Sequence, residues 1–378
     1  MAADSALPGA APAVTVLMPV FNGGRFIGEA IESILGQTFT DFELLVINDG
    51  STDDSLAVIG EYAVRDRRIR VVSRENRGLV ATLNEGLGLA RGAYLARMDC
   101  DDISFPARLR RQYDFMRAHP QYILCGSNSF IVNRSGRLVK KWGVPIQGPD
   151  DFRRFCCFST PFVHSSAFLD LGRLRAEGFQ YDARYSCAED FALWGRISRR
   201  HACIVLDDYL VAWRDHREGI CRSRRDRQML DIADLVEKNI ADEWPDVAVA
   251  NDVFLNLLRD DESTAALDEA ARLSNELIAL LEHLPEKSRE VVRLGLAVFL
   301  NRVVVEIAYI HGLDRARYFR KRLAYNGRLG LRSWCLMMFP HWFPDSLVFR
   351  LESVAEFLFR RVTILRGTGG GGSRPQGL

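Results

Sequence analysis

Three carboxylates gather within four residues, in the segment Asp99-Cys100-Asp101-Asp102. Charges of one sign this close repel each other, so the segment favours a cation. In an extended backbone, residues two positions apart point to the same side, so Asp99 and Asp101 can face one ligand. Carboxylate oxygens suit Mg²⁺ or Mn²⁺, which also take phosphate oxygens of a substrate. The segment predicts a divalent-metal site; the alternative is a solvated acidic turn before the next helix.

Two other acidic positions could also take part in chemistry. Asp49 lies in the turn-prone stretch Asn48-Asp49-Gly50-Ser51-Thr52-Asp53, from which its carboxylate could accept a hydrogen bond from a base. The alternative is simple turn and capping chemistry. Glu189 and Asp190 begin a predicted helix. Acids in a first helical turn favour the helix dipole, which is a purely structural explanation.

These residues lie on an alternating pattern of strands and helices. Short apolar runs rich in β-branched residues predict strands at 14–20, 42–47, 69–73 and 93–98, and helical spacing predicts helices at 25–37, 53–64 and 79–90. The rhythm indicates an α/β fold with a mostly parallel sheet flanked by helices. Ligands of such sheets bind beyond the carboxyl ends of the strands, which is where Asn22, Asp49, Asn76 and Asp99 fall.

Beyond residue 106 the pattern is looser. We predict helices at 106–119 and 189–199 and strands at 122–132, 138–142, 203–206 and 210–214. Only helices are predicted later, at 226–240, 264–284, 288–310 and 346–364. The predicted organisation is a flexible tail at 1–12, a catalytic domain at 13–222, a helical C-terminal domain at 223–366 and a glycine-rich tail at 367–378.

Composition excludes several classes of protein. The chain has 378 residues, with 50 Lys and Arg against 49 Asp and Glu, so its net charge of +1 does not suit a polycation that binds nucleic acid. Neither a dinucleotide-binding glycine fingerprint nor a P-loop occurs. We find no signal peptide and no transmembrane helix, and the eight scattered cysteines contain no C-x-x-C pair. These features predict a cytoplasmic protein with reduced thiols.

Several motifs together resemble a family-2 glycosyltransferase with the GT-A nucleotide-diphospho-sugar transferase fold. The resemblance covers about the first 200 residues and is carried, in order, by residues 16–22, 33–39, 48–53, 76–79, 84–86, 98–102 and 187–194. It departs from the usual pattern at Asn48, where many relatives have Asp, and at Cys100, where a small residue is usual. The C-terminal 150 residues carry no such resemblance.

The resemblance implies a role for individual positions. It implies that Pro19, Phe21 and Asn22 lie against the nucleotide, together with Asn76 and Gly78. Asp49 would bind the base, Asp99 the ribose or sugar, and Arg108, with Gln112, would orient the site. Asp101 would hold the metal, with His216 as a further ligand, although a lone histidine is more often structural. Asp190 would be the catalytic base.

The implied activity is an inverting, metal-dependent transfer of a sugar from a nucleoside diphosphate, a UDP-sugar above all, to a hydroxyl acceptor. Surface polysaccharide, lipopolysaccharide or glycolipid synthesis would supply a saccharide or lipid-linked acceptor. A sugar-nucleotide nucleotidyltransferase is one alternative, but such enzymes need a basic glycine-rich loop after the first strand, and the chain has only Asn22-Gly23-Gly24-Arg25. A scaffold without activity is the other; the intact aspartates argue against it.

Basic residues outnumber acidic ones from Arg315 to Arg366, beside the aromatic segment 334–344. Such a segment could lie on an anionic bilayer, at the inner face of the cell membrane, or it could pack the core of the helical domain.

Overall fold

The computed structural model describes the chain over residues 11–216, 224–247, 253–254 and 264–311. Its contacts group the chain into two compact units, 1–255 with 283–296 and 256–282 with 297–378. The domain boundary expected at residue 222 and the basic aromatic segment after 315 both fall outside the described residues. The candidate site lies wholly in the first unit.

The first unit is built on a nine-stranded sheet, counted over the described residues, in the order β3-β2-β1-β4-β8-β6-β9-β5, with β7 paired to β6. Its first half is parallel and consists of β1 (Val14–Val20), β2 (Phe42–Asp49), β3 (Ile69–Arg74) and β4 (Tyr94–Arg97). Every residue of β1 and β2 is buried, as expected of parallel strands covered on both faces.

The chain reverses its direction of travel across the sheet between β1 and β4. From β1 it proceeds outward to β2 and β3, then returns to place β4 on the other side of β1. The carboxyl ends of β1 and β4 therefore flank a topological switch point, where ligands of open α/β sheets bind. Phe21 and Asn22 follow one of these strands, and Asp99 follows the other.

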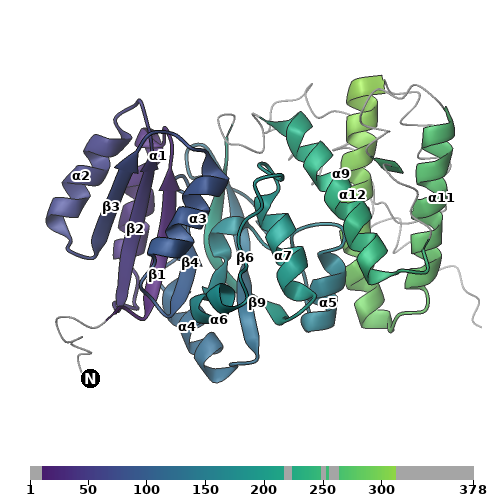
Figure 1. Ribbon diagram of the computed structural model, residues 1–378, viewed down its shortest axis with the longest axis horizontal. Coiled ribbons are helices and arrows are strands. Elements are labelled where there is room, and N and C mark those ends of the chain that lie inside the picture. The colour runs from purple at the N-terminus through teal and green to yellow at the C-terminus, as the bar shows by residue number, and fades with distance from the viewer. Residues whose placement is uncertain (1–10, 217–223, 248–252, 255–263, 312–378) are drawn as a thin grey trace, which may run out of the picture. The chain divides into compact units, whose positions relative to one another are not determined.

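Three helices cover the parallel half: α1 (Gly24–Leu35), α2 (Ser55–Arg65) and α3 (Leu79–Leu89). Helix α1 packs on α2, and α3 lies over β1 and β2, in front of the sheet in Figure 1. The inner face of α1 carries the buried residues Ile27, Ala30, Ile31 and Ile34, at the spacing of one helical stripe.

The second half of the sheet is mixed. Its strands are β5 (Ile103–Ser104), β6 (Tyr122–Asn133), β7 (Leu138–Trp142), β8 (Phe168–Asp170) and β9 (Ala202–Asp215). Strand β8 pairs antiparallel with both β4 and β6, whereas β9 runs parallel to β6. The two strands expected at 203–206 and 210–214 are one strand, because shifts in its register with β6 absorb the polar residues between them. The sequence prediction was wrong on this point.

The remaining helices in the described residues are α4 (Arg108–Ala118), α5 (Pro149–Phe155), a 3₁₀ turn η1 (His164–Ser166), α6 (Leu171–Ala176), α7 (Glu189–Ser198), α9 (Arg225–Glu243), α11 (Thr264–Leu281) and α12 (Glu286–His311). The sequence analysis missed α5, α6, β5 and β8, which are short. The fold class it expected is confirmed. The helix expected at 346–364 lies outside the described residues.

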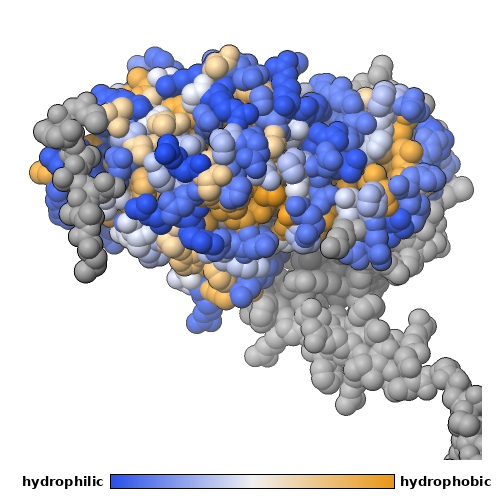
Figure 2. Space-filling model, turned by 90° about the horizontal axis from the view of Figure 1, so that it is seen from below, coloured by the Kyte–Doolittle hydropathy of each residue, from blue (hydrophilic) through white to orange (hydrophobic). Residues whose placement is uncertain are grey.

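Two surface properties bear on the sequence expectations. In the described residues, no helix has both the length and the apolar character needed to cross a membrane. Hydrophilic residues cover most of the face shown in Figure 2, with hydrophobic residues interspersed among them. The described cysteines, Cys100, Cys125, Cys156, Cys157, Cys187 and Cys203, are free.

Candidate active site

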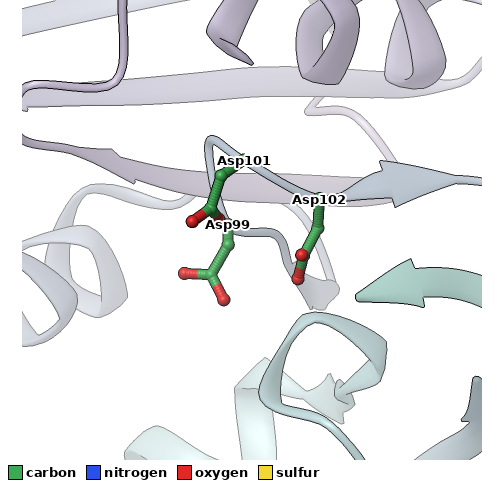
Figure 3. A group of neighbouring side chains, drawn as sticks. All are labelled: Asp99, Asp101 and Asp102. Carbon is green, nitrogen blue, oxygen red and sulfur yellow. The ribbon is translucent and has the colours of Figure 1, made fainter. Parts of the chain in front are cut away.

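The acidic segment forms the loop that follows β4. One carboxylate oxygen from each of Asp99, Asp101 and Asp102 lies within 4.8 Å of the other two. Figure 3 shows the three side chains leaving the same loop with their carboxylates directed to the same side. The side chains of Asp99 and Asp101 are 29% and 27% exposed, whereas Asp102 is buried. A ligand from solvent can therefore reach Asp99 and Asp101.

Asp102 holds the loop from beneath. Its Oδ1 accepts a hydrogen bond from the Arg214 backbone N–H at 2.8 Å, and its Oδ2 accepts one from the Ser165 hydroxyl. Burial raises the pKa of Asp102 well above its usual range, and the charges of Asp101 and Asp99 raise it further. Asp102 thus joins the loop to β9 and η1.

Asp99 is anchored by a buried arginine. Its Oδ2 pairs with Arg97 Nη1 and accepts a hydrogen bond from Ser165 Oγ at 2.9 Å. Arg97 is buried at the end of β4, and its Nη1 also donates to Ser165 Oγ at 3.1 Å. This contact fixes the carboxylate that the sequence assigned to the ribose or sugar.

Asp101 meets His216, as the proposed metal pair requires. Asp101 Oδ2 lies 2.8 Å from His216 Nε2, although 115 positions separate the two residues. Arg214, two residues before His216, donates from Nε to the Asp101 carbonyl at 2.8 Å and from Nη2 to Glu29 Oε2 at 2.6 Å. The end of β9 therefore holds both the backbone and the carboxylate of Asp101.

The loop after β1 is tied to the loop after β2. Asn22, which has a positive φ of 52°, accepts the Thr52 N–H at 2.8 Å on its side-chain oxygen and donates its own N–H to Ser51 Oγ at 3.0 Å. Phe21 beside it is 52% exposed, and Pro19 is buried within β1. Phe21 and Asn22 thus present an exposed edge beside the acidic loop, and Pro19 supports it from within the sheet.

Asp49 organises the loop after β3. Its carboxylate pairs with Arg74 Nη1 and accepts the backbone N–H groups of Arg77 at 2.7 Å and Gly78 at 2.9 Å. Asn76 Nδ2 donates to the Asp49 carbonyl at 2.9 Å. Three of the positions assigned to the nucleotide, Asp49, Asn76 and Gly78, therefore lie together. The Asp49 carboxylate is already engaged in holding the loop, and its role at the base stays a prediction.

Arg108 lies beneath the site and not in it. It is fully buried, and its guanidinium donates to Gln112 Oε1 at 3.0 Å and to the Arg97 carbonyl at 2.7 Å. Burial without a carboxylate partner lowers its pKa to about 9. Arg108 was expected to orient the site together with Gln112, and its bond to the Arg97 carbonyl holds the end of β4 that leads to Asp99.

Glu189 and Asp190 begin α7, and Glu189 lies beside His164, the neighbour of the Ser165 that bonds Asp99. Burial raises the pKa of Asp190; the charge of Asp99 adds to this, whereas the Phe191 N–H bond and Arg97 oppose it. Burial and the charge of Asp190 also raise the pKa of Glu189, to about 8. Asp190 is thus a carboxylate that is a stronger base than a solvated aspartate and close enough to Asp99 to respond to its charge.

A histidine and a tyrosine lie behind this pair. His164 Nε2 and the Tyr181 hydroxyl are 2.9 Å apart, and His164 Nδ1 is 3.5 Å from Glu189 Oε1. Burial lowers the pKa of His164 well below its usual value, and the charge of Arg97 lowers it further. His164 is therefore a neutral residue that hydrogen-bonds Tyr181 behind Glu189, which is the structural role that a lone histidine most often has.

The donor set fits a hard divalent cation. Asp101 and Asp99 offer accessible carboxylate oxygens, His216 lies beside one of them, and Asp102 supplies a third nearby oxygen. Carboxylate oxygens with room for further oxygen ligands suit Mg²⁺ or Mn²⁺. Asp101, Asp99 and His216 would hold the ion.

Residues 15–169 match a family model described as glycosyl transferase family 2. Over these residues the chain is similar to the members of that family. It is 30% identical over 214 residues to an uncharacterised glycosyltransferase of Haemophilus influenzae. This match covers 54% of the chain and 66% of the relative, which is just under two thirds of the relative's length. It is 26% identical over 273 residues to glycosyltransferase GlyG of Streptococcus pneumoniae, over 66% of this chain and 88% of GlyG. A solved structure of S. aureus TarS 1-349 in complex with UDP is similar at 17% identity with a TM-score of 0.49, covering 82% of this chain and 87% of that one.

The sequence analysis missed three residues of the site. Arg97 and Ser165 both bond Asp99, Ser165 also bonds Asp102, and Tyr181 supports His164. Arg97 is a single charge inside a strand, which is itself a signal, because a buried cation requires a partner. Ser165 and Tyr181 carry no pattern in the sequence that would single them out.

Proposed function

We propose that the protein is an inverting, divalent-metal-dependent glycosyltransferase that moves a sugar from a nucleoside-diphosphate sugar to a hydroxyl group. The observation that carries the proposal is the grouping of Asp99, Asp101 and Asp102 at the switch point of the sheet, next to the start of α7. Ser165 bonds Asp99, and the neighbouring His164 lies 3.5 Å from Glu189, the residue before Asp190. The group of three carboxylates suits a metal and a diphosphate, and Asp190 suits removal of a proton.

Each part of the transfer has a residue for it. An acceptor hydroxyl has a pKa far above 7, so Asp190 must take its proton as the oxygen attacks the anomeric carbon. One displacement of this kind inverts that carbon. When bound, a divalent cation offsets the charge that develops on the leaving nucleoside diphosphate. Arg97 holds the Asp99 carboxylate in place, so that the carboxylate can accept hydrogen bonds from the ribose or sugar.

The loop after β1 argues against a nucleotidyltransferase. Such an enzyme would use free backbone N–H groups of a glycine-rich loop to bind a triphosphate. Here the N–H of Gly23 donates to Ser55 Oγ at 2.9 Å, and the N–H of Gly24 donates to Asp53 Oδ2 at 2.9 Å. Both amides are occupied within the protein.

The donor is proposed to be a UDP-sugar and the acceptor a saccharide or lipid-linked saccharide of surface polysaccharide, lipopolysaccharide or glycolipid synthesis. Action in the cytoplasm, at the inner face of the cell membrane, belongs to the same proposal. A lipid-linked acceptor would suit the bilayer alternative for the basic and aromatic segment, the other alternative being that it packs the core of the helical domain. Flotation with anionic vesicles, with and without residues 313–378, tests the membrane contact.

The test of the activity is nucleotide release. The protein is incubated with Mn²⁺ and with UDP-, GDP- and dTDP-sugars, and free nucleoside diphosphate is measured. We expect release from one donor class, loss of release in Asp101→Asn and Asp190→Asn, and retained donor binding in Asp190→Asn. If no donor binds to the wild type and Asp101→Asn behaves identically, the proposed function is wrong.

A further inference from the structure

Helix α9 (Arg225–Glu243) lies against the loop that leads into α7, the helix that carries Asp190. Helix α9 follows the family match by more than 50 residues, and the sequence patterns placed it in a separate helical domain. The structure groups it with the sheet. It contacts α7, and its polar side chains bond residues 184–187, directly before Glu189 and Asp190.

Two side chains of α9 hold the backbone of one residue of this loop, Cys187, on both sides of its Cα. The Asp231 carboxylate accepts the Cys187 N–H at 3.2 Å, and Gln228 Nε2 donates to the Cys187 carbonyl at 3.0 Å. Asp231 and Gln228 are three positions apart, so they lie on one face of the helix. We call these two residues the Cys187 clamp.

Further contacts support the clamp. Asp231 is buried, and its second oxygen pairs with Arg227 Nε at 2.9 Å. One and two turns further along, Asp234 Oδ2 accepts the Tyr185 hydroxyl at 2.6 Å, and Lys238 Nζ donates to the same hydroxyl at 2.7 Å. Residues of α9 thus bind the loop at three residues, Arg184, Tyr185 and Cys187.

We infer that Asp231 and Gln228 are positioning residues for the catalytic base. They act through the backbone N–H and C=O of Cys187 to set where Asp190 lies. The inference rests on the proposed role of Asp190. Cys187 is three residues before Asp190, and the helix that carries Asp190 begins two residues after Cys187. A shift of the clamped peptide therefore moves the base with it.

The physical reason is the sensitivity of proton transfer to position. A displacement of about 1 Å at a reacting group can cost on the order of 100-fold in rate, even when it starts far from the chemistry. The donor site lies on the loops after β1, β2, β3 and β4, which α9 does not bond in the described structure. Loss of the clamp should therefore lower kcat and leave donor binding intact.

The kinetic test uses Asp231→Ala, Gln228→Ala and Asp231→Asn. We expect both alanine variants to lower kcat, by about tenfold or more for Asp231→Ala, while the donor KM stays within about twofold. Asp231→Asn should recover most of the rate because its amide oxygen can still accept the Cys187 N–H. Asp242→Ala is the matched control: Asp242 lies on the same helix but pairs with Arg199, at the far end of α7.

A second readout needs no activity. Cys187 is a buried free thiol in the clamped loop, so its rate of reaction with N-ethylmaleimide reports release of the loop. We expect faster labelling of Cys187 in both alanine variants and unchanged labelling of the buried Cys125 on β6. Mass spectrometry measures the labelling of each cysteine over time. Loss of protection at both cysteines would mark general unfolding and count against positioning.

The outcomes separate the two proposals. An active wild type whose alanine variants keep kcat within about twofold, with Cys187 still protected, overturns the clamp. So does a loss that appears in the donor KM and leaves kcat unchanged. A wild type that releases nucleotide from no donor overturns the proposed function and removes the catalytic meaning of the clamp, although faster Cys187 labelling would still establish the contact itself.

Discussion

Asp101 Oδ2 and His216 Nε2 lie 2.8 Å apart, so the ends of β4 and β9 meet at one pair of side chains. The His216 ring also packs on Phe26 of α1, with 5.1 Å between the ring centroids. The contact joins the two halves of the sheet at the proposed metal site. A histidine beside a carboxylate can bind a metal directly or orient the carboxylate that does.

We predict that Asp101→Asn weakens Mn²⁺ binding by far more than His216→Ala does. Losing Asp101 removes a charged ligand, whereas losing His216 removes a ligand that binds as a neutral imidazole and leaves both carboxylates in place. Titration calorimetry with Mn²⁺ measures both. Asp208→Asn, at a solvent-exposed pair with Arg111, is the control and should bind as the wild type does. Unchanged Mn²⁺ affinity in Asp101→Asn would show that the metal lies elsewhere.

We predict that the rate of transfer falls at acid pH with the protonation of Asp190. A base works only when ionised, so kcat should fall about tenfold for each pH unit below its pKa. Burial raises that pKa above the ordinary aspartate value of 3.8, so the fall should begin at a higher pH than for a solvated aspartate. The pH profile of kcat under saturating donor measures it. An activity that stays flat down to pH 4 would exclude Asp190 as the base.

Glu189 leads to a prediction about stability. Its pKa rises from 4.5 to about 8 on folding, because burial and the Asp190 charge disfavour its ionised form. The unfolded chain therefore releases this proton first, and the contribution of Glu189 to stability decreases as pH rises from about 4.5 to about 8. Glu189→Gln cannot ionise, so its Tm relative to wild type should be higher at pH 8 than at pH 5.

The control for Glu189 is an acid whose surroundings are open to solvent. Glu61 on α2 is 67% exposed and pairs with Arg65 at 3.6 Å. Glu61→Gln should shift Tm by a similar small amount at both pH values, because exposed pairs contribute little. If the shift of Tm relative to the wild type changed by the same amount between pH 5 and pH 8 in both variants, burial of an ionisable Glu189 would be contradicted.

Much of the fold was predictable because buried segments have characteristic patterns of apolar residues in the sequence. Strands such as Val14–Val20 are continuous apolar runs, since helices cover both faces of the sheet there. Strand β8, Phe168–Asp170, has only three residues, too few to show any period. The end of β9 was placed correctly, but two strands were predicted on either side of the polar residues Asp207 and Asp208, although the change of register keeps them in one strand.

The candidate site was predictable where charge density marked it. Asp99 and Asp101 stand out because neighbouring carboxylates require compensation. Ser165 could not be found in this way, because its importance comes from a contact with Asp102, 63 positions away, that only the packed structure creates. Asp231 was missed for the same reason: it is one of many acids on amphipathic helices until α9 packs on the loop at Cys187.

We predict that Ser165→Ala lowers both stability and activity. The hydroxyl is a partner of both Asp99 and Asp102, and its loss leaves the buried Asp102 with one fewer hydrogen bond. Leaving a buried polar group without a partner costs about 1–3 kcal/mol. Urea unfolding measures the free energy, and Ser135→Ala, in the exposed turn after β6, is the control. Equal losses in the two variants would mean that the hydroxyl does not support the acidic loop.

Gly50 and Gly60 should respond oppositely to alanine. Gly50 has a φ of 72°, and an added Cβ would lie 2.6 Å from the backbone nitrogen of Asn76, in the loop that Asp49 holds. Gly60 lies inside α2, with no atom within 4 Å of an added Cβ. Gly60→Ala should therefore stabilise the protein by roughly 0.5–1 kcal/mol, since alanine favours a helix.

Gly50→Ala should destabilise the protein and weaken donor binding, because the 75–78 loop must move to make room. Thermal unfolding measures the first effect, and the KM for the nucleotide sugar, with Gly60→Ala as the matched variant, measures the second. A Gly50→Ala enzyme that is less stable but keeps its donor KM would separate the loop from the nucleotide. In that case the three hydrogen bonds of Asp49 and Asn76 to this turn would serve the fold alone.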